Sequence, residues 1–180
     1  GLRDPFPAVA SRGIQRLREA GVEVTEGVLP EECRWAQRRF LTSVENGRPY
    51  IVLKWAASAD GFLDRLPRTA RKVQRISTPT TDVLVHRWRT EEEAILVGSN
   101  TVLHDDPALT VRHIVGRQPL RVVLDRQGRT PMASKVYDTG TDTLLFTTTP
   151  RPTLPVEQVI MAQENALDRI LAELHGRRVR

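Results

Sequence analysis

Short apolar segments alternate with helical patterns from residue 50 onwards. Segments of strand length lie at residues 50–56, 94–98, 120–124 and 143–146, and helical patterns lie at residues 78–89 and 163–175. In the first helix, Thr78 can cap the N-terminus and Pro79 fits the first turn. Apolar strands that alternate with helices are typical of a parallel sheet covered on both faces. The sequence therefore predicts an α/β fold with a mostly parallel sheet and flanking helices.

The first 47 residues have a different pattern. Helical spacing over residues 8–20 and 30–45 flanks a short alternating segment at residues 22–25. This predicts an α–β–α unit that is too small to hold its own core. The turn residues at 46–49 are the best candidate for a domain boundary. We therefore expect two parts, residues 1–47 and 48–180.

Composition narrows the class of protein. The chain has 180 residues, of which 39% are hydrophobic and 27% charged, and this favours a globular protein. It has no apolar stretch of about 18 residues and no secretory signal pattern, so we expect no membrane association. The single cysteine, Cys33, excludes a disulfide framework and indicates a reducing, cytoplasmic compartment. One cysteine and four scattered histidines also argue against a structural zinc site.

The formal net charge of +5 favours a partner that carries phosphate. The densest basic cluster, residues 65–75, contains no aromatic residue on which a base could stack. We therefore expect a phosphorylated small molecule and not a nucleic acid.

Neither common phosphate-binding loop is present: the chain contains no Gly-x-Gly-x-x-Gly motif and no Walker loop. Polar residues instead follow the predicted strands, where parallel sheets bind ligands. Lys54 interrupts an apolar strand and can face a polar cleft, or it can lie in solvent on an edge strand. Ala56 and its small neighbours allow a flat ligand to approach. Gly98 ends the next strand, and the amides that follow it could receive a phosphate or ribose, or simply begin a helix.

A second polar run, residues 104–112, contains adjacent carboxylates before a proline. Adjacent carboxylates seldom act on one atom, so we expect one to accept sugar hydroxyls and the other to cap the turn. Arg112 and Arg89 have the planar guanidinium that matches phosphate oxygens. Either arginine alone is more often a solvated surface charge.

Together these segments resemble the reductase domain of the RibD family, the bifunctional deaminase/reductases of riboflavin biosynthesis. The resemblance rests on four segments in order, residues 48–61, 76–79, 94–112 and 117–125. The Asp-Asp-Pro-x-Leu-Thr-x-Arg run that ends at Arg112 is its most specific motif. Residues 1–47, with Asp4-Pro5 and the run from Gly13 to Val22, resemble the last elements of the family's cytidine-deaminase-like domain.

The resemblance implies a dihydrofolate-reductase-like fold, NADPH as hydride donor, and self-association into a homo-oligomer. The implied reaction reduces ribosyl C1′ of 5-amino-6-(5-phosphoribosylamino)uracil to give the ribitylamino phosphate. The family's cofactor contacts correspond to Ala56, Thr101 and Asp105. Gly98 is a further candidate for cofactor binding because it ends a predicted strand. Its substrate contacts correspond to Arg89, Leu109 and Arg112, and Lys54 matches a strand lysine near the substrate, our candidate catalytic residue.

The chain departs from the family pattern at two places. Arg75 stands where many members have a tryptophan that packs on the cofactor. Either this arginine stacks on or pairs with NADPH, or the loop is arranged differently. The chain also stops before the family's glycine-rich segment and contains no deaminase zinc motif. We therefore expect a fragment of a longer protein, with zinc only in the missing deaminase portion.

Two other functions fit the same residues. One is a non-catalytic module that binds a phosphoribosyl group or nucleotide with the same arginines. The other is a related reductase that acts on a pterin or folate, although arginines directed at a phosphate argue against a folate. Consumption of NADPH with the phosphoribosylaminouracil discriminates among the three.

Overall fold

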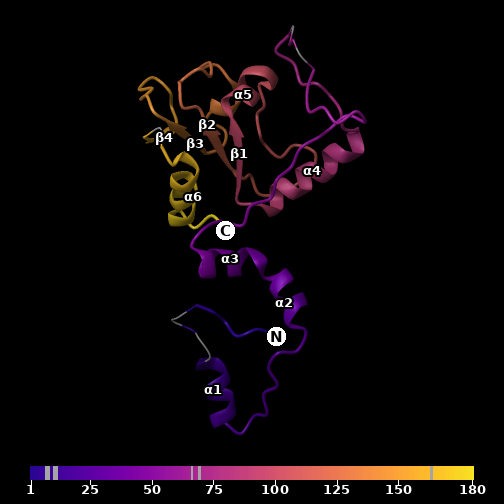
Figure 1. Cartoon of the computed structure of the whole chain (residues 1–180), viewed down its shortest axis with the longest axis vertical. Coiled ribbons are helices and arrows are strands. Elements are labelled where there is room, and N and C mark those ends of the chain that lie inside the picture. The colour runs from indigo at the N-terminus through magenta and orange to yellow at the C-terminus, as the bar shows by residue number, and fades with distance from the viewer. Residues whose placement is uncertain (7–8, 10–11, 66, 69, 163) are drawn as a thin grey trace. The chain divides into compact units, whose positions relative to one another are not determined.

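The structure is a computed structural model that describes residues 1–6, 9, 12–65, 67–68, 70–162 and 164–180 (Figure 1). The chain forms two compact units. One comprises Gly1–Val52 and Ile170–Arg180, and the other comprises Leu53–Arg169. The division at residue 47 into deaminase-like and reductase parts stays a prediction. None of the helices in the described ranges is long and apolar enough to cross a membrane.

The second unit is built on a parallel sheet of four strands. The strands are β1 (Ala94–Gly98), β2 (Leu120–Leu124), β3 (Thr143–Thr147) and β4 (Glu157–Ile160). They lie side by side in chain order, and each neighbouring pair is parallel. In the register, Val97 pairs with Val123, and Val123 pairs with Leu145. The predicted mostly parallel α/β fold is confirmed, and β4 was not predicted.

Apolar side chains from the two central strands form the core of this unit. Val123 and Leu145 are fully buried, and Val102 of α5 (Ser99–Asp105) packs with them. The other members of this cluster are Leu109, Val136, Tyr137 and Leu154. Strands buried on both faces are apolar along their whole length, as the sequence pattern indicated. The short 3₁₀ helix at Lys135–Tyr137 supplies two of these side chains.

One strand residue of this unit breaks the apolar pattern. Arg121 of β2 is fully buried, and its guanidinium donates to the carbonyls of Asp138 and Ala108, among others. It also forms an ion pair with the Asp138 carboxylate at 3.1 Å. A buried cation is tolerated where hydrogen bonds replace its hydration. Arg121 thereby holds the backbone that leads into Leu109, a predicted site residue.

Helix α4 (Pro79–Glu91) matches the prediction for residues 78–89 closely. The Thr78 hydroxyl accepts a hydrogen bond from the amide of Thr81 at 3.3 Å, which caps the first turn. Helix α6 (Ala166–Gly176) matches most of the helix predicted at 163–175, but residues 164–165 form a turn and residue 163 lies outside the described residues. It begins in the second unit and ends in the first.

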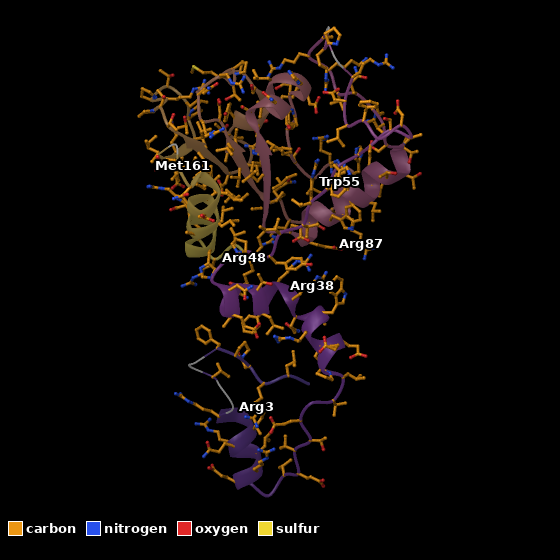
Figure 2. The ribbon with its side chains drawn as sticks, viewed as in Figure 1. Arg3, Arg38, Arg48, Trp55, Arg87 and Met161 are labelled. Carbon is orange, nitrogen blue, oxygen red and sulfur yellow. The ribbon has the colours of Figure 1, made fainter. Side chains whose placement is uncertain are left out.

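The strand predicted at residues 50–56 is wrong. These residues, all of which the structure describes, form no strand. Their large apolar side chains are exposed; Leu53 is 76% and Trp55 is 66% exposed. Trp55 is labelled in Figure 2. A strand requires a neighbour that supplies its hydrogen bonds, and local apolar character does not provide one. The segment ends in a turn in which the Gly61 amide donates to the carbonyl of Ser58 at 2.9 Å.

Among its described residues the first unit has the short helices α1 (Arg12–Glu19), α2 (Pro30–Ala36) and α3 (Arg38–Asn46), beside the end of α6. The helix predicted at 30–45 is therefore divided at Gln37, whose φ of −99° and ψ of 14° leave helical geometry. The strand predicted at 22–25 is wrong, because these residues form no strand. Of the helix predicted at 8–20, residues 8, 10 and 11 lie outside the described residues.

Candidate functional site

The two predicted substrate arginines meet around one residue of the second unit. Arg89, in the last turn of α4, donates from Nη1 to the carbonyl oxygen of Thr110 at 3.0 Å. Arg112 donates from Nη1 to the Thr110 hydroxyl at 3.1 Å. The structure therefore brings together two cations that are far apart in the sequence. Nearby positive charges repel unless an anion lies between them.

The electrostatics of this pair favour an anion. The pKa of Arg89 lies below its usual value, first because the side chain is buried and second because Arg112 is positively charged. The nearby Asp82 acts in the opposite direction, but its carboxylate also accepts a hydrogen bond from Arg75. The buried Nε of Arg89 has no hydrogen-bond partner among the described residues. Phosphate oxygens would satisfy this donor and both charges.

The main chain between Leu109 and Arg112 is held residue by residue. Leu109 has a positive φ of 56° and its side chain is 4% exposed within the core. The amide of Val111 donates to Gln118 Oε1 at 2.7 Å, and its carbonyl accepts from Gln118 Nε2 at 3.1 Å. Because the Leu109 side chain is in the core, its main chain is what remains for the predicted substrate contact.

His86 completes this cluster, and the sequence reasoning missed it. The residue is 4% exposed, and its Nδ1 accepts a hydrogen bond from the amide of Arg112 at 3.0 Å. The ring of His113 meets it edge to face, with centroids 4.4 Å apart. Burial, followed by the charges of Arg89, His113 and Arg112, lowers the pKa of His86 from 6.5 to about 4. One signal was available: His86 and Arg89 are three residues apart and share a helix face.

The predicted cofactor residues lie at the end of β1 and along α5. Gly98 ends the strand in extended geometry, and a Cβ added there would meet no atom within 4 Å. Thr101 follows in α5 and is half-buried. Asp105 ends the helix, and its carboxylate accepts a hydrogen bond from Arg68 at 2.9 Å. Asp105 is thus held by the basic segment, a contact that the sequence reasoning did not foresee.

Arg129 is a further cation at this edge that the sequence reasoning missed. Its Nη2 donates to the Ser99 hydroxyl and to the side-chain oxygen Oδ1 of Asn100, each at 3.0 Å, at the start of α5. The loop that carries it is fixed by the fully buried Asp125, which accepts from the amides of Arg129 and Thr130 at 3.0 and 2.8 Å. The turn-like sequence around residue 128 gave no local signal for this position.

The remaining predicted residues are less constrained. Lys54 is exposed and makes no hydrogen bond or ion pair with the described residues, and Ala56 is half-buried. Arg75, which stands at the family's tryptophan position, forms an ion pair with Asp82 of α4. The hydrogen bond from Arg75 is the main cause of the lowered pKa of Asp82. Arg75 therefore holds the loop against α4 in this structure.

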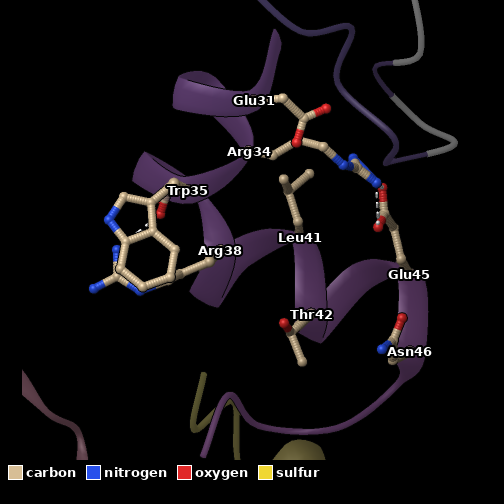
Figure 3. A pocket seen from close by; sticks show the side chains of 8 residues that line it. All are labelled: Glu31, Arg34, Trp35, Arg38, Leu41, Thr42, Glu45 and Asn46. Atoms are coloured by element: carbon tan, nitrogen blue, oxygen red, sulfur yellow. Dashed lines mark hydrogen bonds and ion pairs between the residues drawn. The ribbon is translucent and has the colours of Figure 1, made fainter. Parts of the chain in front are cut away.

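One pocket of about 330 Å³ lies in the first unit, between α2 and α3 (Figure 3). Three of its charged side chains, Arg34, Arg38 and Glu45, contact neighbours in the same unit. Arg34 pairs with Glu45 at 3.1 Å, and the guanidinium of Arg38 lies 4.2 Å from the centre of the Trp35 ring. None of the predicted site residues lines this pocket.

Comparisons of the sequence with known proteins all identify similarity to RibD proteins. The family model described as the RibD C-terminal domain matches residues 49–180. The riboflavin biosynthesis protein RibD of Chlamydia pneumoniae is 43% identical over 151 residues, which cover 82% of this chain and 39% of that protein. RibD of Aquifex aeolicus is 41% identical over 137 residues, which cover 76% of this chain and 38% of that protein.

A solved structure is similar over almost the whole chain. It is a diaminohydroxyphosphoribosylaminopyrimidine deaminase/5-amino-6-(5-phosphoribosylamino)uracil reductase from Thermotoga maritima, with a TM-score of 0.86 and 34% identity. The similarity covers 99% of this chain and 50% of that one. The expected fold is thereby confirmed. The chain spans half or less of the length of each of these relatives.

Proposed function

The chain belongs to the RibD C-terminal domain family, and from this premise we propose that it reduces 5-amino-6-(5-phosphoribosylamino)uracil with NADPH in riboflavin biosynthesis. The observation that carries the proposal is the convergence of Arg89 and Arg112 on Thr110. A pair of guanidinium groups, one partly buried and one exposed, suits a dianionic phosphate ester, which this substrate carries on its sugar.

In this proposal the two arginines bind the 5′-phosphate and thereby place the sugar. Phosphate binding is remote from the reacting carbon, so its binding energy is available to orient that carbon. The ring-opened sugar presents an imine carbon at C1′, which gains a hydride while the attached nitrogen gains a proton. The Lys54 ammonium is the candidate for electrostatic stabilisation of this step.

The residues at the end of β1 fit a dinucleotide cofactor. The open space at Gly98 allows close approach to the backbone, and the Asp105 carboxylate can accept ribose hydroxyls. The Arg129 guanidinium supplies a positive charge for a cofactor phosphate beside Ser99. When bound, NADPH supplies the hydride for C1′. The basic surroundings favour the additional 2′-phosphate of NADPH over NADH.

The direct test mixes the protein that contains this chain with NADPH and the phosphoribosylaminouracil, and follows nicotinamide absorbance. We expect NADPH oxidation and a product heavier than the substrate by two hydrogen atoms. NADH should give a lower kcat/KM than NADPH. Substrate binding without oxidation would support the non-catalytic binding module instead, and oxidation with only a pterin or folate would support the related reductase.

A further inference from the structure

His86 is a buried side chain to which the proposed reaction assigns no role. It lies on α4 three residues before Arg89, so the two side chains share a face of the helix. A polar side chain that is 4% exposed is retained only where it makes hydrogen bonds. The partner of His86 is the main chain of Arg112, whose amide lies 3.0 Å from Nδ1.

This hydrogen bond defines the state of the imidazole. A backbone amide only donates, so Nδ1 accepts and the ring proton is on Nε2. A protonated His86 would have hydrogens on both nitrogens and would lose this acceptor. The charged groups around it are Asp82 and Arg89 on α4 and Arg112 and His113 on the facing segment. Three of these four disfavour a further positive charge, which keeps the ring neutral.

His86 is one of three anchors on consecutive residues of the facing segment. Arg89 holds the carbonyl of Thr110, and Gln118 holds both main-chain groups of Val111. His86 holds the amide of Arg112, which is the last of the three. The anchor on Arg112 is the one that acts directly on a residue carrying a proposed phosphate-binding side chain.

We propose that His86 is a positioning residue for the phosphate site: as a neutral acceptor it fixes the main chain of Arg112, so that the guanidinium groups of Arg112 and Arg89 converge on one anion. The proposal rests on the proposed function in that Arg112 binds the substrate phosphate. His86 itself touches neither the phosphate nor the reacting carbon in this role.

The test compares three variants in the protein that contains this chain. His86→Asn keeps an acceptor close to the position of Nδ1, His86→Leu removes the acceptor, and His86→Gln moves it farther along the side chain. We expect His86→Leu to raise KM for the phosphorylated substrate about tenfold or more, because the Arg112 amide loses its partner. His86→Asn should stay within about threefold of the wild type, and His86→Gln should resemble His86→Leu. If His86→Leu does not fold, the Asn and Gln pair carries the same comparison.

Two readouts separate positioning from a general structural defect. The KM for NADPH should be the same in every variant as in the wild type. The KM for a substrate without the phosphate should also stay close to the wild-type value in all three variants. Equal loss with both substrates, or an Asn variant as poor as the Leu variant, would overturn the proposal.

A binding probe separates this proposal from the proposed function. Ribose 5-phosphate should raise the Tm of the wild type and of His86→Asn, and should raise that of His86→Leu much less. Wild-type stabilisation by ribose 5-phosphate without NADPH oxidation would overturn the reductase function but not the role of His86. If the wild type shows neither stabilisation by ribose 5-phosphate nor NADPH oxidation, the phosphate site is overturned, and the role of His86 with it.

Discussion

Arg68 Nη2 donates a hydrogen bond to Oδ1 of Asp105 at 2.9 Å. The same guanidinium donates from Nε to Asp64 at 2.7 Å and from Nη1 to the carbonyl of Lys72 at 2.6 Å. The Arg68 side chain is only 11% exposed, so solvent screens these contacts less than those of a surface pair. Arg68 therefore fixes the direction of the carboxylate that we propose accepts the ribose hydroxyls of the cofactor.

Replacement of Arg68 should weaken cofactor binding specifically. We expect Arg68→Ala to raise KM for NADPH by about tenfold, because a charge-assisted hydrogen bond that orients Asp105 is lost. The KM for the phosphorylated substrate should stay nearly unchanged. Arg65→Ala is the matched control, because Arg65 is an exposed cation of the same segment. Equal effects of the two variants would show that only the charge of the segment matters.

The adjacent carboxylates Asp105 and Asp106 should have different functions, one in cofactor binding and the other in stability. Asp106 accepts from Arg71 at 2.9 Å and from the amide of Lys135 at 3.1 Å, and its φ of 45° suits asparagine. Asp106→Asn should therefore lower Tm by a few degrees and leave KM for NADPH unchanged. Asp105→Asn should raise KM for NADPH about tenfold, since hydrogen bonds to a carboxylate are roughly twice as strong as neutral ones. An unchanged KM in Asp105→Asn would return Asp105 to a turn-capping role.

The sequence predicted three of the four described strands, missed β4, and predicted a strand at residues 50–56 that does not form. Strands β2 and β3 were predicted because their apolar runs are buried. Strand β1 has a similar apolar run and was also predicted, although it is only partly buried and Leu96 is 45% exposed. Residues 50–56 have an equally apolar run but no strand beside them in the described structure. Apolar periodicity reports what a segment can bury, and it does not report whether a neighbour supplies backbone hydrogen bonds.

The candidate site shows the same limit at the level of side chains. Arg89 and Arg112 were predicted by residue type and by the resemblance, and the structure brings them to the same residue. The contacts of Arg68 with Asp105 and of His86 with Arg112 join residues separated by 37 and 26 positions. Nothing in the local sequence encodes such pairings, because they depend on how α4 and the loops pack.

The titration of His86 should make the folded state sensitive to acid. Its pKa is about 4 in the folded protein and 6.5 when exposed, so the unfolded chain takes up the proton first as the pH falls. This uptake lowers the free energy of unfolding. The loss is absent at a pH well above the unfolded-state pKa and reaches roughly 3 kcal/mol at a pH below the folded-state pKa. His86→Asn lacks this titration. We therefore expect its free energy of unfolding in urea to fall less than that of the wild type between about pH 7 and about pH 5. Parallel pH curves would contradict this assignment.

Gly116 should not tolerate a side chain. A Cβ there would overlap Cγ2 of Thr90 and lie 2.8 Å from Cβ of Thr90, on α4. We expect Gly116→Ala to lower the free energy of unfolding by about 1–3 kcal/mol, because a β-branched helical side chain cannot move away easily. Thr90→Ser removes Cγ2, so the double variant should recover part of the loss. Gly176→Ala is the control, since its Cβ would meet no atom within 4 Å. Equal stability of Gly116→Ala and the control would contradict this packing.

The proposed phosphate site is tested by replacing Arg112. Arg112 and Arg89 both contact Thr110, and the buried Nε of Arg89 has no partner among the described residues. We expect Arg112→Ala to lower kcat/KM for the phosphorylated substrate about 10²-fold or more, because phosphate binding also positions the reacting carbon. Arg112→Lys should restore only part of this, because lysine lacks the planar pair of donors.

The decisive comparison for Arg112 uses a substrate without the phosphate. The wild type should be much poorer with it, and Arg112→Ala should lose little further activity, because the group that the arginine binds is already missing. Arg89→Ala should show the same dependence on the phosphate. The double variant should lose less than the product of the two single losses, because both guanidinium groups bind the same anion. If Arg112→Ala instead harms both substrates equally, Arg112 supports the fold or the cofactor, and the phosphate binds elsewhere.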